Sequence, residues 1–589
     1  MCGIIGYIGG GNAAREVYQG LKRLEYRGYD SAGGAFLNGD ELVVVKKQGR
    51  VEKLLPFIDG LRATAGIGHT RWATHGAPSD GNAHPHTVGD ISVVHNGIIE
   101  NYAELKSELV ADGAVFVSDT DSEVIAHLLN KFYDGDLAYA MKKTVDMLEG
   151  SYAILAVRRG VQRIYAACNK SPLIIGYGDG ENFCASDEPA LAGKCDGISV
   201  LDDGDFAEIS ADGVIIYDGD MQAVIREISP NLAVCENLGL GDCPHYMLKE
   251  IREVPLSVTQ TVKAFAGAEQ KLKAAFAGVD RIILTGCGTA YHAALLGKRY
   301  FEIFAKIPAE TEIASEFRYK NPVIGKNTAV IAVSQSGETA DTVEAARLAR
   351  GLGARVIAVT NSRRSQLNRV ADAVVPVAAG VEICVAATKS YTGQVAALLA
   401  CAFAVAGYSY AEKAGVFGNI AELCGKVIEN IDASSLAHLC SRSRGVYFLG
   451  RDLDYAVALE GSLKLKEISY VPGEGYPAGE LKHGTLALID ENTVSVFLIT
   501  DERLAGKCAN AVEQVVSRGG RAAVITNVNG VPEKLPECVE HIILLPECEP
   551  YLAPFLTAVA VQTLAYRTAV ILNRDPDKPR NLAKSVTVE

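Results

Sequence analysis

The sequence predicts an α+β region followed by two α/β regions of similar construction. Over residues 1–228, short β-type runs such as Leu42 to Val45 and Tyr152 to Val157 alternate with glycine-rich turns and a few amphipathic helices, a pattern typical of stacked antiparallel sheets. Over the rest of the chain, continuous apolar strands alternate with longer helical segments. The second pattern indicates doubly wound parallel sheets that are covered by helices on both faces.

An internal repeat defines the domain organisation. Asn327 to Val333 recurs 165 residues later as Asn492 to Leu498, and Arg355 to Asn361 corresponds to Arg521 to Asn527. A duplicated domain is the economical explanation of such a long period. The predicted order of segments is a first domain at 1–228, a linker at 229–255, two repeated domains at 256–420 and 421–570, and a tail at 571–589.

Composition narrows the class of protein. The chain has 589 residues with a net charge of −14, which makes nucleic acid an unexpected partner. Its longest apolar runs, Val395 to Ala406 and the interrupted run Phe555 to Leu572, fit buried helices better than membrane spans. The 14 cysteines include no CxxC pair and no secretory signal precedes them. We therefore expect reduced thiols, no membrane association and a cytoplasmic location.

Cys2 is the first candidate for chemistry. Removal of Met1 would place a thiol and a free α-amine on one residue, and the amine could then act as the general base for its own nucleophile. The alternative is a small buried cysteine on a short apolar strand. Other residues of the first domain must decide between the two interpretations.

An amide hydrolase built on Cys2 would need groups that stabilise an oxyanion and hold an amino acid. The Asn96 side chain and the Gly97 backbone N–H could stabilise the oxyanion. Arg71 could bind an α-carboxylate and Asp121 an α-ammonium group. Each has an ordinary alternative: a hairpin turn at Asn96-Gly97, a surface ion pair for Arg71, and a helix N-cap for Asp121.

Five motifs occur together and in order in this domain: Cys2-Gly3-Ile4, Tyr26-Arg27-Gly28-Tyr29-Asp30, Arg71-Trp72-Ala73-Thr74-His75-Gly76, Asn82-Ala83-His84-Pro85-His86 and His95-Asn96-Gly97. Together they resemble the class II glutamine amidotransferases. The resemblance implies an N-terminal-nucleophile fold with a glutaminase site. In that site Cys2 would attack the glutamine amide, and Asn96 and Gly97 would form the oxyanion hole. The residues that would bind glutamine are Arg71, Trp72, His75 and Asp121, with a gating role for Trp72.

Histidines are frequent near these motifs, at positions 69, 75, 84, 86 and 95. They show neither an HExxH motif nor paired Cys/His spacing, so structural polar contacts are a better interpretation than a metal site. We expect no metal.

Two loops of the first repeat have the composition of phosphate-binding cups. Gly286 to Ala290 and Ser334 to Thr339 each follow a predicted strand and combine small residues with hydroxyl groups, which suits an anion at a helix N-terminus. Tyr291 interrupts a GxGxxG pattern, so a phosphomonoester is favoured over a dinucleotide. The alternative is that these hydroxyls cap helices. The matching loops of the second repeat, 450–452 and 499–502, carry acidic groups that would repel a phosphate.

Glu460 to Glu467, Gly479 to Gly484 and the tail Asn581 to Glu589, taken with Ser334 to Thr339, resemble the glucosamine-6-phosphate synthase family over essentially the whole chain. The resemblance implies two sugar-isomerase (SIS) domains, a glutamine-dependent conversion of fructose 6-phosphate to glucosamine 6-phosphate, internal transfer of ammonia, a homodimer, and no metal or organic cofactor. It places the phosphate on Thr289, Ser334, Gln335, Ser336 and Thr339.

The same resemblance assigns four further residues. Lys584 would form a Schiff base with the open-chain sugar, Glu467 would move a proton between C1 and C2, His483 would assist ring opening, and Lys464 would position the sugar. A surface-exposed pair is the alternative for Lys464 and Glu467. Ala290 departs from the family pattern, in which a serine commonly follows Gly-Thr.

Two other functions remain possible on sequence grounds. The first is a sugar-phosphate sensor in which Cys2 is vestigial. The second is another Cys-dependent amidotransferase, such as one that acts on phosphoribosyl diphosphate; the duplicated second half argues against it.

Overall fold

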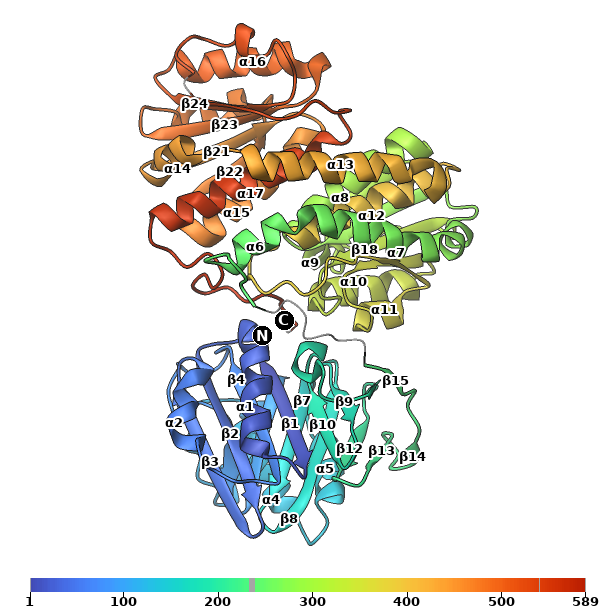
Figure 1. The fold of residues 1–589 in the computed structure, drawn as a ribbon. Helices are drawn as coiled ribbons and strands as arrows, with labels where there is room; N and C mark the ends of the chain where they lie inside the picture. Colours follow the sequence, from blue (N-terminus) through green and yellow to red (C-terminus); the bar gives the residue numbers. More distant parts are fainter. Residues whose placement is uncertain (1, 232–238, 540, 588–589) are drawn as a thin grey trace. The chain divides into compact units, whose positions relative to one another are not determined.

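A computed structural model of the protein describes residues 2–231, 239–539 and 541–587 (Figure 1). The chain forms two compact units. The first contains the described residues up to 231 together with 583–587, and the second contains residues 239–582 apart from 540. The predicted tail at 571–589 is therefore divided: residues 571–582 belong by their contacts to the second unit, and 583–587 belong to the first.

The first unit contains two antiparallel sheets. Across the first sheet the strands are β15 (Ser229–Pro230), β11 (Gly197–Val200), β9 (Ile174–Tyr177), β10 (Glu181–Ala185), β1 (Gly3–Gly9), β4 (Ala65–Arg71), β2 (Ser31–Asn38) and β3 (Glu41–Gln48). Across the second they are β14 (Ala223–Val224), β13 (Val214–Tyr217), β12 (Phe206–Ile209), β8 (Val161–Asn169), β7 (Gly150–Arg158), β6 (Ile91–Ile99) and β5 (His86–Val88).

Helices cover the outer face of each sheet in this unit. The α-helices are α1 (Ala13–Leu24), α2 (Leu55–Ile58), α3 (Tyr102–Ala111), α4 (Glu123–Phe132) and α5 (Leu137–Val145), and the short 3-10 turns are η1 (Glu25–Arg27), η2 (Val51–Leu54) and η3 (Glu188–Leu191). One apolar cluster lies between the two sheets, a second joins α1 to the first sheet, and a third joins α3, α4 and α5 to the second sheet. The unit is thus the layered α+β fold that the alternating strands predict.

The second unit contains two parallel sheets of five strands with the same strand order. The first sheet is β17 (Ala309–Ile313), β16 (Arg281–Gly286), β18 (Thr328–Ser334), β19 (Arg355–Thr360) and β20 (Ala373–Pro376). The second is β22 (Gly473–Pro477), β21 (Gly445–Gly450), β23 (Thr493–Ile499), β24 (Arg521–Thr526) and β25 (His541–Leu544). The matching orders are the structural counterpart of the sequence repeat.

Helices fill the space between these two sheets and cover their outer faces (Figure 1). They are α6 (Tyr246–Arg252), α7 (Val254–Ala275), α8 (Thr289–Tyr300), α9 (Ala314–Phe317), α10 (Ala340–Gly351), α11 (Gln366–Val370), α12 (Lys389–Val405), α13 (Tyr410–Asn430), α14 (Ser434–Ser441), α15 (Leu453–Ser469), α16 (Glu502–Val516) and α17 (Ala553–Ile571). Shorter turns are η4 (Phe301–Ala305), η5 (Glu480–His483), η6 (Thr485–Leu488) and η7 (Pro532–Lys534). One continuous apolar core runs from one sheet to the other through these helices.

Two helices of this core are almost entirely apolar. α12 and α17 correspond to the two apolar runs of the sequence, and nearly every residue of both is buried. Among the described residues, α17 has a length and hydropathy that would suit a membrane span, but it is packed inside the unit. Burial between two sheets explains its composition without a bilayer.

The strand order marks where ligands are expected. In each sheet the chain leaves the first strand for the neighbour on one side and then crosses to the neighbour on the other side. Ligands of such sheets bind at the carboxyl ends of the strands on either side of this reversal. In the first sheet that place is the end of β16 and β18, where the two predicted phosphate loops begin.

Candidate active sites

The Cys2 thiol lies against the backbone of Trp72. Gly3, the first residue of β1, is paired with Thr70 of β4, and this register brings Cys2 beside the end of β4. The Trp72 backbone N–H lies 3.3 Å from Cys2 Sγ, and the Trp72 carbonyl oxygen lies 3.5 Å from it. Burial raises the pKa of the Cys2 thiol. The thiol is therefore kept protonated, and its use as a nucleophile requires a base.

Asn96 and Gly97 lie in the middle of a strand and not in a hairpin turn. Both belong to β6, where Asn96 is paired with Ala153 and Gly97 with Tyr152 of β7. The Asn96 side-chain NH₂ donates to the Cys2 carbonyl oxygen at 3.1 Å, whereas its buried side-chain oxygen has no partner. The hairpin alternative is wrong, and an amide donor is brought next to the nucleophile.

Only glycine can occupy position 97. Its φ is +139°, and a Cβ at this position would lie 1.9 Å from the Ser151 carbonyl oxygen. An L side chain is therefore excluded both by conformation and by space. The glycine allows the strand to turn its amide at this position while it stays paired with β7.

Arg71 is buried at the end of β4 rather than being a surface ion-pair residue. One of its terminal nitrogens donates to the carbonyl oxygens of His75 and Gly76, and the other has no partner. An unpaired guanidinium nitrogen in a buried place is suited to an incoming carboxylate. The His75 ring packs edge to face against Tyr102, with its Nδ1 also without a partner.

Asp121 is buried and does not cap α4, whose N-cap is Ser122. Its carboxylate accepts from the Ile99 backbone N–H at 2.9 Å, and therefore holds the end of β6. Its charge raises the pKa of the Cys2 thiol, and the charge of Arg71 lowers it, each by less than burial does. The structure thus brings Arg71 and Asp121 into electrostatic range of Cys2.

Two residues of the Tyr26 to Asp30 motif make hydrogen bonds to the backbone near the Cys2 thiol. Arg27 Nε donates to the Cys2 carbonyl oxygen at 3.2 Å, and the Arg27 guanidinium pairs with Asp187. Asp30 accepts from the Ala73 backbone N–H at 2.9 Å. The sequence pointed to no role for either residue: Arg27 lies in a motif without an assigned function, and Asp187 lies outside every motif. Their contacts fix the backbone on both sides of the thiol.

Three buried histidines of this unit pack ring against ring. The ring centroids of His69 and His84 are 4.0 Å apart, and those of His84 and His86 are 4.6 Å apart. Burial is the main cause that lowers the pKa of all three, to about 3 for His86. Among the residues that the structure describes, no cluster of His, Cys, Asp and Glu has the arrangement of a metal site. The group packs as neutral rings.

The two predicted phosphate loops lie side by side at one edge of the first parallel sheet. β16 and β18 are neighbours, with Thr285 paired to Ala332. In the second loop the Ser334 hydroxyl accepts from the Gly337 backbone N–H at 3.0 Å and lies 2.9 Å from the Thr339 hydroxyl. These hydroxyls therefore shape the loop, but neither α8 nor α10 has a side-chain N-cap hydrogen bond, so the capping alternative is wrong for these helices. Gln335 and Ser336 remain partly exposed at its surface.

Thr289, in the first loop, contacts a residue that sequence analysis did not assign. Its hydroxyl donates at 3.1 Å to Glu460, which is fully buried on α15. The other carboxylate oxygen of Glu460 lies 2.8 Å from His292 Nδ1 of α8. Glu460 stood inside the Glu460 to Glu467 motif, but a helix pattern could not show that it faces another domain.

Lys464 is buried and pairs with the partly exposed Glu467, so the surface-pair alternative is wrong. Lys464 Nζ lies 2.6 Å from Glu467 Oε2 and 3.5 Å from Glu460 Oε1. The Lys464 side chain is 1% exposed and that of Glu467 is 21% exposed. Despite burial, the two carboxylates raise the pKa of Lys464. The helix thus presents Glu460, Lys464 and Glu467 on one face, as positions three and four apart do.

Of the other two assigned residues, His483 is not part of this group. His483 is exposed on η5, and within the described residues it makes no hydrogen bond to Glu460, Lys464 or Glu467. Lys584 belongs by its contacts to the first unit.

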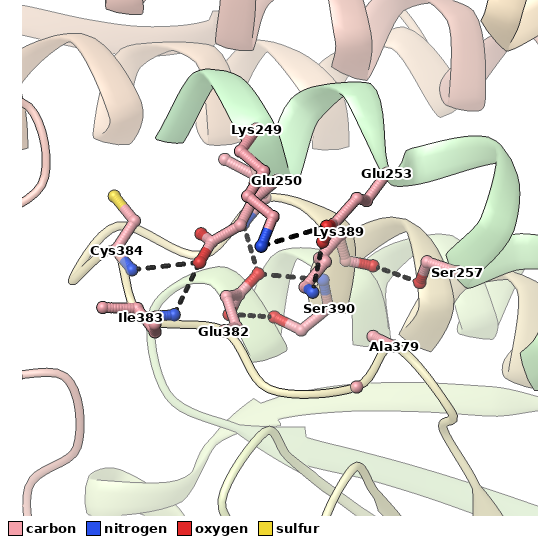
Figure 2. Close-up of polar contacts among 12 residues, drawn as sticks. Lys249, Glu250, Glu253, Ser257, Ala379, Glu382, Ile383, Cys384, Lys389 and Ser390 are labelled. Carbon is pink, nitrogen blue, oxygen red and sulfur yellow. Dashed lines mark hydrogen bonds and ion pairs between the residues drawn. The ribbon is translucent and has the colours of Figure 1, made fainter. Parts of the chain in front are cut away.

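The loop between β20 and α12 lies near Lys464 and is fixed by buried carboxylates. Figure 2 shows Glu250 of α6 accepting from the backbone N–H groups of Ile383 and Cys384, and Glu382 accepting from Ser390. Cys384 of this loop is within electrostatic range of Lys464.

The same loop is also attached to the first part of the predicted tail. The Val385 backbone N–H donates to the Asp577 carbonyl oxygen at 3.0 Å, and the Asp577 carboxylate caps the first turn of α6 through Tyr246 and Met247. Three distant parts of the sequence therefore hold one loop, and such long-range contacts leave no local signal in the sequence.

Comparison with known proteins shows which domain families the two units resemble. The glutamine amidotransferase domain family matches residues 69–193, and the SIS domain family matches 275–404 and 439–572. The C-terminal domain of glucosamine-fructose-6-phosphate aminotransferase from Francisella tularensis is 33% identical. Its alignment has a TM-score of 0.56 and covers 58% of this chain and 100% of that one.

Relatives of full length are similar from end to end. An isomerizing glutamine–fructose-6-phosphate aminotransferase of Thermus thermophilus is 44% identical over 606 residues, and that of Caldanaerobacter subterraneus subsp. tengcongensis is 43% identical over 610 residues. Both matches cover 100% of each chain. They confirm the resemblance and the fold class expected from the sequence. The chain belongs to the family of isomerizing glutamine–fructose-6-phosphate aminotransferases, and it is an enzyme.

Proposed function

We propose that the protein converts fructose 6-phosphate and glutamine into glucosamine 6-phosphate and glutamate. Family membership supports this reaction, and the contact of the Asn96 amide with the Cys2 backbone, beside the buried Arg71, is the observation that carries it. A chain that only sensed a sugar phosphate would have no use for a buried thiol with an amide donor and an unpaired guanidinium nitrogen around it.

The first half-reaction is the hydrolysis of the glutamine amide. The Cys2 thiol loses its proton to the α-amine that Met1 removal exposes, and the sulfur attacks the amide carbon. The resulting oxyanion accepts from the Asn96 NH₂ and the Gly97 N–H. Ammonia leaves with the proton, and water then cleaves the glutamyl thioester to release glutamate. Arg71 and Asp121 bind the charged groups of the amino acid, with Trp72 and His75 beside them.

The second half-reaction adds that ammonia to the sugar. The sugar phosphate lies on the loops that carry Thr289 and Ser334 to Thr339, and Lys464 positions the sugar. By resemblance to the family, Lys584 forms a Schiff base with the ketose, His483 assists ring opening and Glu467 moves a proton between C1 and C2. Ammonia replaces the lysine amine, and the overall step from ketose and ammonia releases one water.

Ammonia passes between the two sites inside the protein in this proposal, and the enzyme works as a homodimer in the cytoplasm. Its proposed partners are the two small substrates, glutamine and fructose 6-phosphate.

The test compares nitrogen donors. Glucosamine 6-phosphate is measured with glutamine or with an ammonium salt, for the unmodified chain, Cys2→Ala and Lys584→Ala. Cys2→Ala should lose the glutamine-dependent reaction and keep the ammonium-dependent one. Lys584→Ala should lose both and keep glutamine hydrolysis.

Three results would contradict the proposal. Full glutamine-dependent synthesis by Cys2→Ala would remove the thiol from the mechanism, and intact synthesis by Lys584→Ala would remove the Schiff base. Tight binding of fructose 6-phosphate without any turnover would favour a sensor instead.

A further inference from the structure

Glu460 is a charged residue in an unfavourable position. It is fully buried in the middle of α15, between helices that otherwise make an apolar core. Replacing such a buried ionic group by an apolar side chain is often neutral or stabilising. The Glu460 carboxylate makes hydrogen bonds and an ion pair to side chains, namely those of Thr289, His292 and Lys464. A stabilising role for the fold alone does not account for it.

The partners of Glu460 come from two domains. Thr289 and His292 lie in the first turn of α8 in the first repeat, and Lys464 lies one turn further along α15 in the second repeat. The distances are 3.1 Å from Thr289 Oγ1, 2.8 Å from His292 Nδ1 and 3.5 Å from Lys464 Nζ. One carboxylate therefore ties the helix that begins at a phosphate loop to the helix that carries Lys464 and Glu467.

Lys464 depends on this carboxylate for its position. It is the charged member of the set of largest fully buried side chains among the described residues. Its ammonium lies between buried Glu460 on one side and the partly exposed Glu467 on the other. Removing the buried partner would leave the ammonium with Glu467 alone, and long lysine side chains have several rotamers to choose from.

The surroundings hold few other groups that could replace Glu460. Tyr391 of α12 is fully buried, its hydroxyl has no partner, and the charge of Glu460 contributes to raising its pKa after burial. Cys384 acts on Lys464 as a weak electrostatic neighbour. Lys464, His292 and Thr289 together keep the pKa of Glu460 below its usual value in spite of burial. The group is therefore charged at neutral pH.

We propose that Glu460 and His292 are positioning residues for the sugar reaction. Glu460 holds Lys464 and, through it, Glu467 in the geometry needed for proton transfer, and His292 orients Glu460 from the neighbouring domain. The inference rests on the proposed function for the roles of Lys464 and Glu467. Because Thr289 is also a proposed phosphate ligand, the same contact links the phosphate loop to the group that moves the proton.

The test uses ammonium-dependent synthesis, so that glutamine hydrolysis does not contribute to the measured rate. The variants are Glu460→Gln, which keeps shape and removes charge, His292→Asn, which keeps a donor near the Nδ1 position, and His292→Leu, which removes it. Asp454→Asn is the matched control, because Asp454 is a buried carboxylate on the same helix that bonds to Thr500 instead.

Glu460→Gln should lower kcat by roughly 100-fold, with KM for fructose 6-phosphate within about threefold of the unmodified value. The alkaline limb of its kcat–pH profile should move to lower pH, because Lys464 loses one of the two charges that raise its pKa. The kcat of His292→Leu should fall as that of Glu460→Gln does. The kcat values of His292→Asn and Asp454→Asn should stay within about threefold of the unmodified value.

An unchanged kcat and pH profile in Glu460→Gln would overturn the inference, and so would an equal loss in Asp454→Asn. If Glu460→Gln fails to fold, judged by glutamine hydrolysis and thermal unfolding, the His292→Leu and His292→Asn pair decides: equal activities overturn the proposal.

A crystal structure separates this inference from the proposed function. If the unmodified chain makes no glucosamine 6-phosphate, the substrate assignment fails. The position of Lys464 in crystals of Glu460→Gln or His292→Leu still tests the positioning role. Loss of the 2.6 Å contact to Glu467 supports it, and an unmoved Lys464 contradicts it.

Discussion

Gly97 combines two demands at one residue. It pairs with Tyr152 in a regular antiparallel ladder, and its φ of +139° turns the backbone in a way that L residues rarely adopt. The Ser151 carbonyl oxygen would lie 1.9 Å from any Cβ. The position therefore accepts glycine alone, and the orientation of its N–H follows from that restriction.

Gly97→Ala should lower glutamine-dependent activity by roughly 100-fold, the order expected when an oxyanion donor is displaced. Ammonium-dependent synthesis should remain. Gly113→Ala is the control, because Gly113 also has a positive φ of +93° but has open space around its Cβ position. Equal losses in the two variants would mean that strain, and not the displaced donor, is responsible.

Asp454 illustrates a buried carboxylate whose charged form is disfavoured by its surroundings. Its oxygens accept from the Thr500 backbone N–H at 2.9 Å and from the Thr500 hydroxyl at 2.6 Å. Burial outweighs these bonds and raises the pKa of Asp454 to about 6. A folded pKa above the unfolded value means that the folded state binds the proton more tightly. The associated stability is present below pH 4 and is lost as pH rises through about 6.

Asp454→Asn should remove this pH dependence. Relative to the variant, the unmodified chain should lose about 3 kcal/mol of stability between pH 4 and pH 7, from a shift of about two pKa units. Thermal unfolding of both proteins at a series of pH values measures it. A difference in melting temperature that does not change with pH would contradict the assignment.

At the scale of elements, the two repeats use the same turn for different purposes. Gly288 and Asp452 occupy equivalent positions with nearly equal dihedral angles, φ 52° and ψ −125° against φ 53° and ψ −119°. In the first repeat the turn is open and Ala290 behind it is partly exposed. In the second, the corresponding residue is Asp454, whose own carboxylate fills the space against Thr500. A carboxylate already in place leaves no room for a phosphate.

The loop between β20 and α12 depends on Glu382 at the same scale. Its carboxylate accepts from the Thr388 N–H, the Ser390 N–H and the Ser390 hydroxyl. Glu382→Ala would leave these buried donors unpaired, at a cost of roughly 1–3 kcal/mol for each group. We expect faster amide hydrogen exchange over residues 383–390 and weaker binding of fructose 6-phosphate.

Glu422→Ala serves as the control, because Glu422 is an exposed carboxylate on α13 that pairs with Lys426. Unchanged exchange in Glu382→Ala would show that the contacts to Glu250 and Asp577 hold the loop by themselves.

Whole strands and helices could be predicted from the sequence more completely than the contacts between distant residues. Strand and helix periods and the 165-residue repeat were sufficient for the sheets, because those signals are local or repeated. The strand position of Gly97, the burial of Arg71 and the cross-domain contacts of Glu460 depend on residues far away in the chain. A motif such as Glu460 to Glu467 identifies the helix face, but only packing shows which side chain meets α8.

At the scale of the molecule, the protein joins two kinds of fold with two kinds of chemistry. The layered antiparallel unit holds a thiol, and the parallel-sheet unit holds hydroxyl loops and a buried Lys464 group. In the proposed function, ammonia is the intermediate that connects the two sites. The central claim is therefore that nitrogen from glutamine reaches the sugar within one protein.

Isotope transfer tests that claim most directly. The unmodified chain is incubated with fructose 6-phosphate, glutamine labelled with ¹⁵N in its amide, and an excess of unlabelled ammonium salt. Mass spectrometry of the product should show glucosamine 6-phosphate that carries ¹⁵N well above its fraction in the free ammonium pool. Product whose ¹⁵N content equals that of the pool, or no amino sugar at all, would contradict the account.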